Sequence, residues 1–215
     1  VIGVVTIPGG VAVVASSTWA AIKGRDALQV TWDETDADKR GTAELLEEYK
    51  ALAAKPGLSV RKDGDAEKAI AGAKTVIDAE FAFPFLAHAP MEPLNAILAF
   101  KDGKATIWSG SQLQTIDQSV AAAILGIKPE DVAINTQWAG GSFGRRAVYN
   151  SDYVAEVAHI VKALATDKPI KLVWTREDDI KGGYYRPMYL HKVKVGLTES
   201  GEIAGWHHRI VGQSI

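Results

Sequence analysis

The most informative absence in this sequence is cysteine, of which its 215 residues contain none. Without thiols these residues cannot form a disulfide, hold an iron–sulfur cluster or build a thiolate zinc site. The net charge of only −2 provides no basic stripe of the kind that binds nucleic acid. No apolar run reaches the length of a bilayer-spanning helix. The remaining composition, 47% hydrophobic and 23% charged, is typical of a folded globular protein.

Both ends of the chain lie in or near apolar, strand-like segments. The chain starts at Val1 without methionine, and it stops at Ile215 just after the apolar residues Ile210 and Val211. We therefore expect an internal part of a longer protein, in which any targeting segment would precede Val1.

Hydrophobic periodicity predicts a chain that mixes strands and helices, and the fold class we expect is α+β (mixed α/β). Gly24 and Gly126 are expected to end two of the helices, and Ser16 or Ser17 can cap the first of them. Residues 101–104 predict a hairpin turn between two of the strands. Alternating or β-branched residues predict strands at residues 1–7, 11–15, 27–32, 75–83, 95–100, 105–109, 132–137, 171–175, 189–198 and 203–211. Helical spacing with capping residues predicts helices at residues 17–24, 42–52, 65–71, 115–125 and 151–164.

The residue pattern changes near residue 75 from helix-like to strand-like, which indicates more than one domain. We expect residues 1–35 to be the end of a small β-rich domain and residues 36–74 to be a bridging helical segment. Residues 75–215 would then be the first part of a second domain.

A glycine-rich loop, Gly140–Arg146, follows a predicted strand and precedes a predicted helix. Its glycines allow backbone N–H groups to approach a ligand closely, and a helix N-terminus favours negative charge. Arg145 and Arg146 add donors suited to phosphate or oxo groups. The loop matches neither the dinucleotide fingerprint nor the phosphate loop of nucleotide-binding proteins. An ordinary tight turn with two surface arginines is an equally open interpretation.

Two further segments offer polar side chains. Gln112 follows the predicted strand that ends at Ser109, and ligands tend to bind at the carboxyl edge of such sheets. A glutamine at a helix start is nevertheless more often solvated. In the segment His88–Asn95, Glu92 could act as an acid or a base. The alternative is that these side chains bind backbone groups that the prolines leave unpaired.

The remaining histidines form no recognisable site. His207 and His208 lie on opposite faces of one predicted strand and cannot easily share a metal. His159 in a predicted helix and His191 in a predicted strand lack partners. No metal set and no Ser-His-Asp arrangement is assigned, and a helix start alone explains the acidic segment Thr175–Asp179.

Taken together and in order, these segments resemble the molybdenum-binding large subunit of the xanthine dehydrogenase and aldehyde oxidase family. The resemblance is closest to the branch of the isoquinoline 1-oxidoreductase β subunit. Each motif alone is weak, but their order and spacing are specific and they span nearly the whole chain. The matching segments are Gly10–Ala15 with Trp19–Ala21, His88–Asn95, Trp108–Gln112, Gly140–Arg146, Trp174–Asp179 and Tyr185–Pro187.

The resemblance implies a fragment of a molybdenum hydroxylase that oxidises aldehydes or N-heteroaromatic compounds with oxygen from water. Residues 75–215 would be the first part of its molybdopterin-binding domain, with the cofactor as the cytosine dinucleotide. Gln112 matches the glutamine beside the metal, and no residue here matches a direct metal ligand. The implied cofactor-binding residues are Gln112, Gly141, Phe143, Gly144 and Arg145.

The resemblance also implies partners. The [2Fe-2S] clusters would lie on a separate iron–sulfur small subunit, which agrees with the absence of cysteine here. Electrons would leave through that subunit and, in this branch, pass onward to a cytochrome c. Since this branch is often exported after cofactor insertion, the resemblance favours a periplasmic over a cytoplasmic location.

Departures from the family pattern limit what the resemblance implies. Ser142 stands where many relatives have a third consecutive glycine. Ala147 stands where purine-oxidising relatives have a substrate-binding glutamate, which disfavours a purine substrate. The family's catalytic glutamate has no counterpart here, so we assign no catalytic residue and expect this part alone to be inactive. Two alternatives stay open: a non-catalytic scaffold or interaction domain that retains the fold, and a phosphate- or nucleotide-binding domain.

Overall fold

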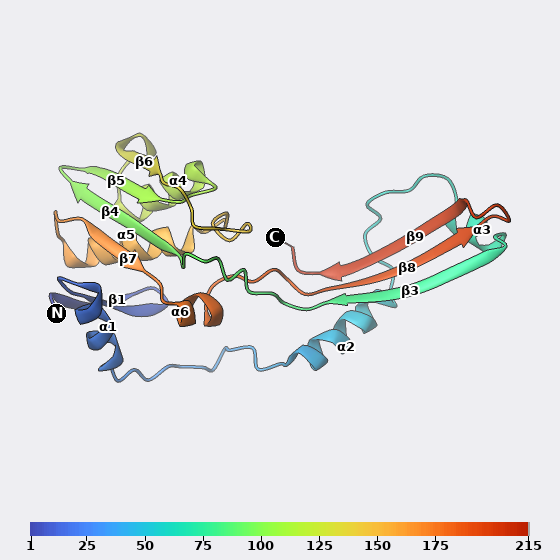
Figure 1. The fold of residues 1–215 in the computed structure, drawn as a ribbon, viewed down its shortest axis with the longest axis horizontal. Coiled ribbons are helices and arrows are strands. Elements are labelled where there is room, and N and C mark those ends of the chain that lie inside the picture. Colours follow the sequence, from blue (N-terminus) through green and yellow to red (C-terminus); the bar gives the residue numbers. More distant parts are fainter. Residues whose placement is uncertain (215) are drawn as a thin grey trace. The chain divides into compact units, whose positions relative to one another are not determined.

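The computed structural model describes residues 1–214 as two compact units, each built from two separate stretches of chain. The first unit comprises Val1–Trp32 and Ala87–Tyr185, and the second comprises Asp33–Leu86 and the stretch that starts at Arg186. Within the described residues there are three sheets and six α-helices, which confirms the mixed α/β fold class (Figure 1). None of the helices in this range combines the length and apolar character needed to cross a membrane. The domain boundaries near residues 35 and 74 stay a prediction.

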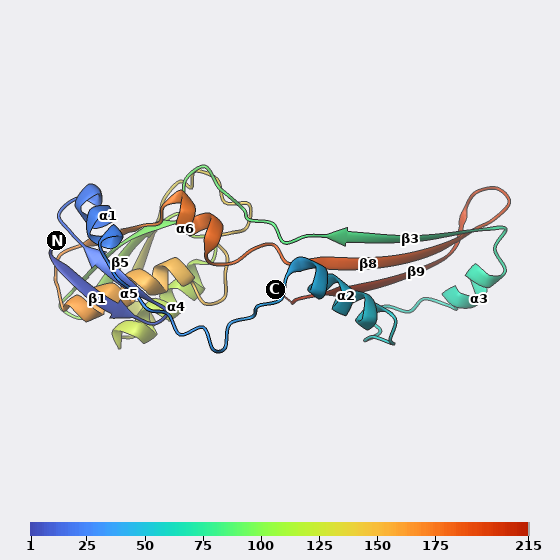
Figure 2. The same ribbon diagram turned by 90° about the horizontal axis from the view of Figure 1, so that it is seen from below.

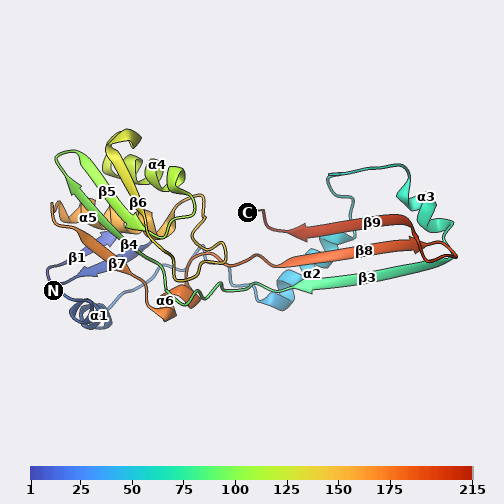
Figure 3. The ribbon, with the colours of Figure 1, turned by 45° about the horizontal axis from the view of Figure 1, so that its top comes forward.

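The first unit contains a four-stranded sheet with helices α4 and α5 packed against one of its faces (Figure 3). Strand β5 is parallel to β6 and antiparallel to β4, which is also antiparallel to β7. Alternate residues of β4 and β5 are buried in a core shared with both helices, as the period of two along a strand requires. In spatial order the strands are β6 (Val132–Thr136), β5 (Lys104–Ser109), β4 (Asn95–Lys101) and β7 (Ile170–Val173), and the helices are α4 (Gln114–Leu125) and α5 (Asp152–Leu164).

Local signals join and end these elements as predicted. Strands β4 and β5 form a hairpin around Asp102 and Gly103, whose φ angles are 50° and 73°. Helix α4 ends at Gly126, whose φ of 77° is the left-handed conformation typical of a glycine at a helix end. A short 3₁₀ turn, η1 (Pro129–Asp131), then leads into β6.

A hairpin of β1 (Gly3–Ile7) and β2 (Gly10–Val14) packs against α5 through β1. Helix α1 (Thr18–Asp26) follows the hairpin. Ser17 caps α1, since its hydroxyl accepts a hydrogen bond from the Ala20 N–H at 3.3 Å, as the sequence predicts.

Two sequence predictions near this helix are wrong. Helix α1 does not end at Gly24 but continues to Asp26. Gly24 is instead required by packing, since a Cβ there would lie 2.7 Å from the Val13 side chain. The strand predicted at Ala27–Trp32 does not form, because this segment pairs with no other strand within residues 1–214. Its alternating side chains therefore have no sheet on which to pack.

The second unit contains a three-stranded antiparallel sheet in the order β3 (Thr75–Phe83), β8 (Tyr189–Leu197) and β9 (Ile203–Gly212). Helices α2 (Thr42–Ala53) and α3 (Ala66–Ala71) lie along one face of this sheet (Figure 2). These elements agree with the segments predicted from periodicity.

Close packing holds both helices on that face. Tyr49 and Ala53 of α2 form a small core with Met188 and Leu190. Helix α3 approaches the sheet at Gly205, where a Cβ would lie 3.0 Å from the side chain of an isoleucine of α3.

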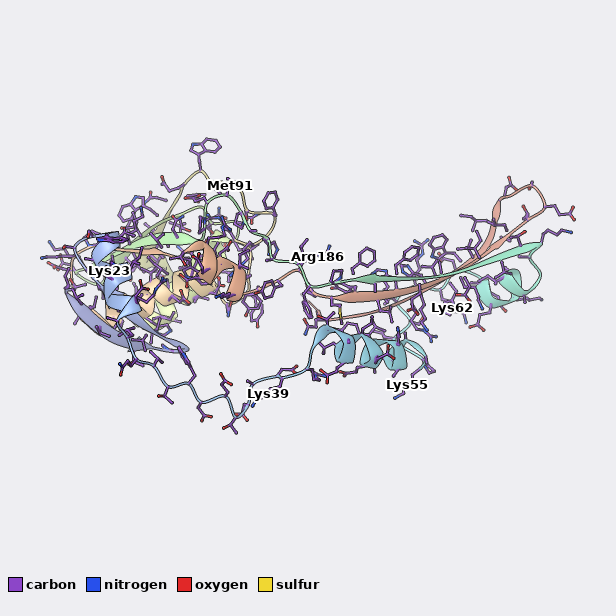
Figure 4. The ribbon with its side chains drawn as sticks, turned by 60° about the horizontal axis from the view of Figure 1, so that its bottom comes forward. Lys23, Lys39, Lys55, Lys62, Met91 and Arg186 are labelled. Carbon is purple, nitrogen blue, oxygen red and sulfur yellow. The ribbon has the colours of Figure 1, made fainter. Side chains whose placement is uncertain are left out.

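The opposite face of the same sheet is apolar and partly exposed. The strand register places no Asp, Glu, Lys or Arg of these three described strands on it, and side chains project from it on the side away from α2 and α3 (Figure 4). The charged residues lie on the helix-bearing face, where Lys192 pairs with Glu80 at 3.4 Å. The apolar face carries Ile77, Ala79, Phe81, Phe83, Val193, Val195 and Trp206 together with His191 and His208.

Candidate cofactor site

Polar segments from four parts of the chain meet at one edge of the four-stranded sheet. Because β5 and β6 are parallel, the segments that follow them leave from the same edge. The antiparallel strand β4 begins at that edge, where Ala96 pairs with Ser109. Strand β7 ends there, where Val173 pairs with Asn95. The topology thus gathers four segments that the sequence singled out: residues 88–95, 108–112, 140–146 and 174–179.

The loop Gly140–Arg146 has an unusual backbone conformation. Gly141, Phe143 and Gly144 have φ angles of 94°, 57° and 92°. For Phe143, which has a side chain, the left-handed conformation costs on the order of 1 kcal/mol. That side chain is 75% exposed, so its packing does not offset the cost. Backbone strain of this kind is typical of loops that hold a ligand.

The same loop leaves a row of backbone donors free. The Gly140 N–H donates to Glu92 at 2.7 Å, and the Arg145 N–H donates to the Ser142 carbonyl oxygen at 3.0 Å. Between them, the N–H groups of residues 141–144 donate no hydrogen bond to any atom of residues 1–214. Consecutive unpaired N–H groups in a loop with positive φ angles suit an anion or an oxo group.

Gln112 lies directly against this loop. Its backbone N–H donates to the carbonyl oxygen of Arg146 at 3.3 Å, and its side-chain oxygen accepts a hydrogen bond from the Ser142 hydroxyl. The same hydroxyl accepts a hydrogen bond from the Arg146 N–H at 3.2 Å. The structure therefore brings Gln112 and the glycine loop together, while their contact with a cofactor stays a prediction.

Glu92 connects the proline-rich segment to the loop. One carboxylate oxygen accepts hydrogen bonds from the Gly140 N–H at 2.7 Å and from the Arg146 guanidinium at 3.3 Å. The other accepts one from the Asn95 side-chain amide at 2.8 Å. The hydrogen bond from Gly140 is the main cause that holds the pKa of Glu92 below its usual value. These contacts support the structural interpretation of Glu92 and disfavour an acid–base role.

Arg145 is buried, whereas one interpretation of the sequence placed it on the surface. Its side chain is only 1% exposed and donates to the Asp152 carboxylate at 2.6 Å. The guanidinium also lies near the rings of Trp174 and Tyr184, at 5.4 and 5.9 Å from their centroids. This cation is therefore bound within the protein.

Arg146 is buried as well, with a fully covered side chain that binds Glu92 and lies 6.0 Å from the ring centroid of Tyr153. The interpretation of the loop as a turn with two surface arginines is therefore wrong. Sequence reasoning missed this burial because the acidic and aromatic partners come from distant segments. Among the backbone groups of the loop, the N–H groups of residues 141–144 stay unpaired within the described residues.

Buried polar contacts fix the segment before Gln112. The Ser111 hydroxyl donates to the buried carboxylate of Asp117 on α4. Ser109 shares a 3.0 Å hydrogen bond with the hydroxyl of Tyr153 on α5. Burial raises the pKa of both Asp117 and Tyr153. Two helices thus determine where the strand end places Gln112.

Glu156 is an ionisable residue of this unit that the sequence reading missed. Its carboxyl group accepts a hydrogen bond from the Trp174 indole N–H at 2.7 Å. Burial raises the pKa of Glu156 to about 7. Glu156 lies four residues after Asp152, on the same face of α5. This spacing is the sequence feature that could have pointed to Glu156. Its hydrogen-bond partner, Trp174, comes from a distant part of the chain.

Arg176 connects the segment after β7 to the proline-rich segment. Its guanidinium pairs with Asp179 and donates to the carbonyl oxygens of Pro90 and, at 3.2 Å, of Met91. The Met91 side chain is 88% exposed (Figure 4). Helix α6 (Arg176–Lys181) begins with a capping box, so the acidic residues form a helix start, as predicted.

One prediction about the histidines is wrong. His191 does have a partner, because its Nδ1 lies 2.9 Å from Nε2 of His208 in the second unit. The register pairs His208 with Val193, which places both histidines on the same face of the sheet. No cluster of three or more metal-ligating side chains occurs among the described residues, 1–214.

The strand edge and glycine-rich loop of the first unit have the layout typical of ligand-binding α/β domains. Residues 50–214 match the family described as the molybdopterin cofactor-binding domain. The chain is 31% identical to isoquinoline 1-oxidoreductase subunit beta of Brevundimonas diminuta, over 98% of the chain and 28% of that protein. It is also 31% identical to the membrane-bound aldehyde dehydrogenase [pyrroloquinoline-quinone] of Gluconacetobacter polyoxogenes, over 97% of the chain and 28% of that protein.

Solved structures show the same fold. The structure of quinoline 2-oxidoreductase from Pseudomonas putida 86 covers 91% of this chain with a TM-score of 0.69 and 18% sequence identity. The chain corresponds to 25% of that structure's chain. The chain belongs to the molybdopterin cofactor-binding domain family, and the resemblance drawn from its motifs is confirmed. It spans 28% of the length of the two curated relatives.

Proposed function

We propose that Gln112 and the loop residues 141–144 contact a molybdopterin cofactor that carries molybdenum, within a larger molybdenum hydroxylase. The observation that carries this proposal is the row of free backbone N–H groups beside a glutamine amide. Such donors suit the electronegative ligands that surround molybdenum, because they are fixed in place before the ligand binds.

The residues present fit such a group sterically. A Cβ on Gly144 would meet no atom of the chain within 4 Å, so the loop leaves space on that side. Arg145, which the resemblance implied as a cofactor contact, is proposed to support the loop instead, because its guanidinium is bound to Asp152. The proposed contacts are therefore the Gln112 amide and the N–H groups of Gly141, Phe143 and Gly144.

When bound, the cofactor would supply the redox centre that hydroxylates an aldehyde or an N-heteroaromatic ring with oxygen from water. The names of the two relatives, an isoquinoline oxidoreductase and an aldehyde dehydrogenase, support this substrate range. Ala147 in the place of a substrate-binding glutamate disfavours purines. This chain would hold and orient the cofactor, and none of its residues is assigned as the base.

We further infer that the cofactor is the cytosine dinucleotide form and that electrons leave through an iron–sulfur subunit. A cytochrome c would act as a later acceptor. One relative is subunit beta of isoquinoline 1-oxidoreductase, which supports a multi-subunit assembly.

The test is the metal content of the full-length subunit, produced in a host that makes the molybdenum cofactor. We expect about one molybdenum per subunit, as the proposed stoichiometry of a single site requires. Gln112→Ala and Gly144→Val should both lower the molybdenum content, the second because a β-branched residue is poorly tolerated at a positive φ. A wild-type protein without molybdenum would overturn the proposal. The same sample should also be extracted and analysed for bound pyrroloquinoline quinone, because the name of one relative includes that cofactor.

The alternative is a non-catalytic scaffold that retains the fold. In that case Gln112→Ala and Gly144→Val would leave the activity and metal content of the assembly unchanged.

A further inference from the structure

The orientation of the Gln112 side-chain amide is set by one neighbouring hydroxyl group. Ser142 lies 30 residues away in sequence, and its hydroxyl donates to Oε1 of Gln112. Within residues 1–214, the Nε2 group of Gln112 has no hydrogen-bond acceptor. The amide therefore presents two N–H donors on its other side.

The number of hydrogen bonds that the Ser142 hydroxyl can donate and accept explains why the oxygen of Gln112, and not its nitrogen, faces Ser142. A serine hydroxyl has one proton to donate and can accept two hydrogen bonds. The Arg146 N–H already donates to this hydroxyl at 3.2 Å. If the amide were flipped, Ser142 would accept from two donors and its own proton would lack an acceptor. The unflipped amide gives the Ser142 hydroxyl proton an acceptor, which favours this orientation by about the free energy of one hydrogen bond.

The consequence concerns the chemistry of the site. The unflipped Gln112 adds two N–H donors to the free N–H groups of the loop, so that all of these groups are donors. A flipped Gln112 would place a carbonyl oxygen beside them, which repels an oxo or anionic ligand.

We propose that Ser142 is a positioning residue that keeps the Gln112 amide nitrogen directed toward the cofactor. This inference rests on the proposed function, since it concerns how Gln112 meets the molybdenum cofactor.

The first experiment is a double-mutant cycle in the full-length, cofactor-loaded subunit. Ser142→Ala should lower kcat/KM for an aldehyde substrate about 5- to 10-fold and speed the loss of molybdenum during dialysis, in line with the loss of one hydrogen bond. Ser142→Thr keeps the hydroxyl and should restore both values. In a Gln112→Ala background, Ser142→Ala should have no further effect, because the residue acts through Gln112. An equal loss in that background would show a general effect on the loop and overturn the proposal.

The second experiment needs no cofactor. In the full-length subunit prepared without cofactor, the carbon-13 shift of the Gln112 side-chain carbonyl reports whether its oxygen accepts a hydrogen bond. We expect Ser142→Ala to move this resonance and Ser142→Thr to retain it, with the Gln112 amide protons exchanging freely in the wild type. A resonance unchanged by Ser142→Ala, or protected amide protons, would overturn the proposal. Absence of molybdenum from the wild-type subunit would instead overturn the proposed function and leave this result standing.

Discussion

Glu92 and Gly140 are 48 residues apart in sequence, yet the Glu92 carboxylate accepts a 2.7 Å hydrogen bond from the Gly140 backbone N–H. The same carboxylate oxygen lies 3.3 Å from a guanidinium nitrogen of the buried Arg146. One side chain therefore fixes the first residue of the glycine loop and neutralises a cation beneath it. The proline-rich segment is in this way a structural support of the candidate site.

Replacing Glu92 should weaken this support. Glu92→Gln keeps the shape but removes the charge, so the buried guanidinium of Arg146 loses its ionic partner. We expect a loss of about 1–2 kcal/mol in the free energy of unfolding, reduced from the full cost of a buried pair because Glu92 is partly exposed. Urea denaturation of the 215-residue chain measures this. Glu199→Gln, whose side chain is 86% exposed, is the matched control and should have almost no effect. Equal effects of the two substitutions would contradict the role given to Glu92.

Two glycines of the loop, Gly140 and Gly144, should respond differently to replacement by alanine. A Cβ on Gly140 would lie 2.5 Å from Cβ of Glu92, so Gly140→Ala must displace this contact and should cost about 1–3 kcal/mol of stability. A Cβ on Gly144 meets no atom within 4 Å, so Gly144→Ala should cost only about 1 kcal/mol for its positive φ. Thermal or urea unfolding of both variants tests the order. If Gly144→Ala were the more destabilising, the packing of Glu92 against the loop would be wrong.

Glu156 should make the stability of the first unit depend on pH. Its pKa is raised from 4.5 to about 7 in the folded protein, mainly by burial. The folded state therefore favours the protonated form, and this contribution is complete below pH 4.5 and lost as the pH rises through about 7.

Glu156→Gln removes the charge and keeps an acceptor for the Trp174 indole N–H. At pH 8 the variant should be more stable than the wild type by on the order of 2 kcal/mol, and this advantage should shrink toward pH 4.5. Urea denaturation at both pH values is the measurement. Glu130→Gln, with a side chain that is 70% exposed, serves as the control. A gain for Glu156→Gln that did not vary with pH would argue against a buried, titrating carboxyl.

Much of the fold follows from local sequence signals. The turn at Asp102 and Gly103 and the helix end at Gly126 need only residues close in sequence, and both were predicted. The prediction that Gly24 ends a helix is wrong because Gly24 instead lets the Val13 side chain approach α1. This contact joins two elements, so the local sequence does not reveal it. Ala27–Trp32 has the alternation of a strand, but no neighbour within the described residues pairs with it.

The candidate site could be predicted in position but not in detail. The order of motifs located Gln112 and the glycine loop, and the strand topology explains why they meet. The burial of Arg145 and Arg146 could not be predicted, because the residues that cover their guanidiniums come from several distant segments.

The pairing of His191 with His208 was hidden by a single irregularity. If the register at Leu197 and Ile203 continued along the hairpin, His208 would lie opposite Lys192, on the other face from His191. The irregularity between Gly196 and Leu197 shifts the pairing by one residue. His208 then lies opposite Val193 and reaches His191 diagonally on the apolar face.

This pair should make the second unit less stable in acid. Burial and the neighbouring His208 lower the pKa of His191 below its usual value of 6.5. The folded state therefore resists protonation, so the stability is complete above pH 6.5 and declines as the pH falls through the lowered pKa. His191→Phe keeps an aromatic ring beside Phe83 and should abolish much of the decline between pH 8 and pH 5, measured by urea denaturation of the 215-residue chain. His207→Gln, on the opposite face, should decline as the wild type does. His159, whose pKa is also lowered by burial, stays unchanged in all three proteins, so the difference isolates the pair. A decline in His191→Phe equal to that of the wild type would show that protonation of His191 does not cause the loss of stability in acid.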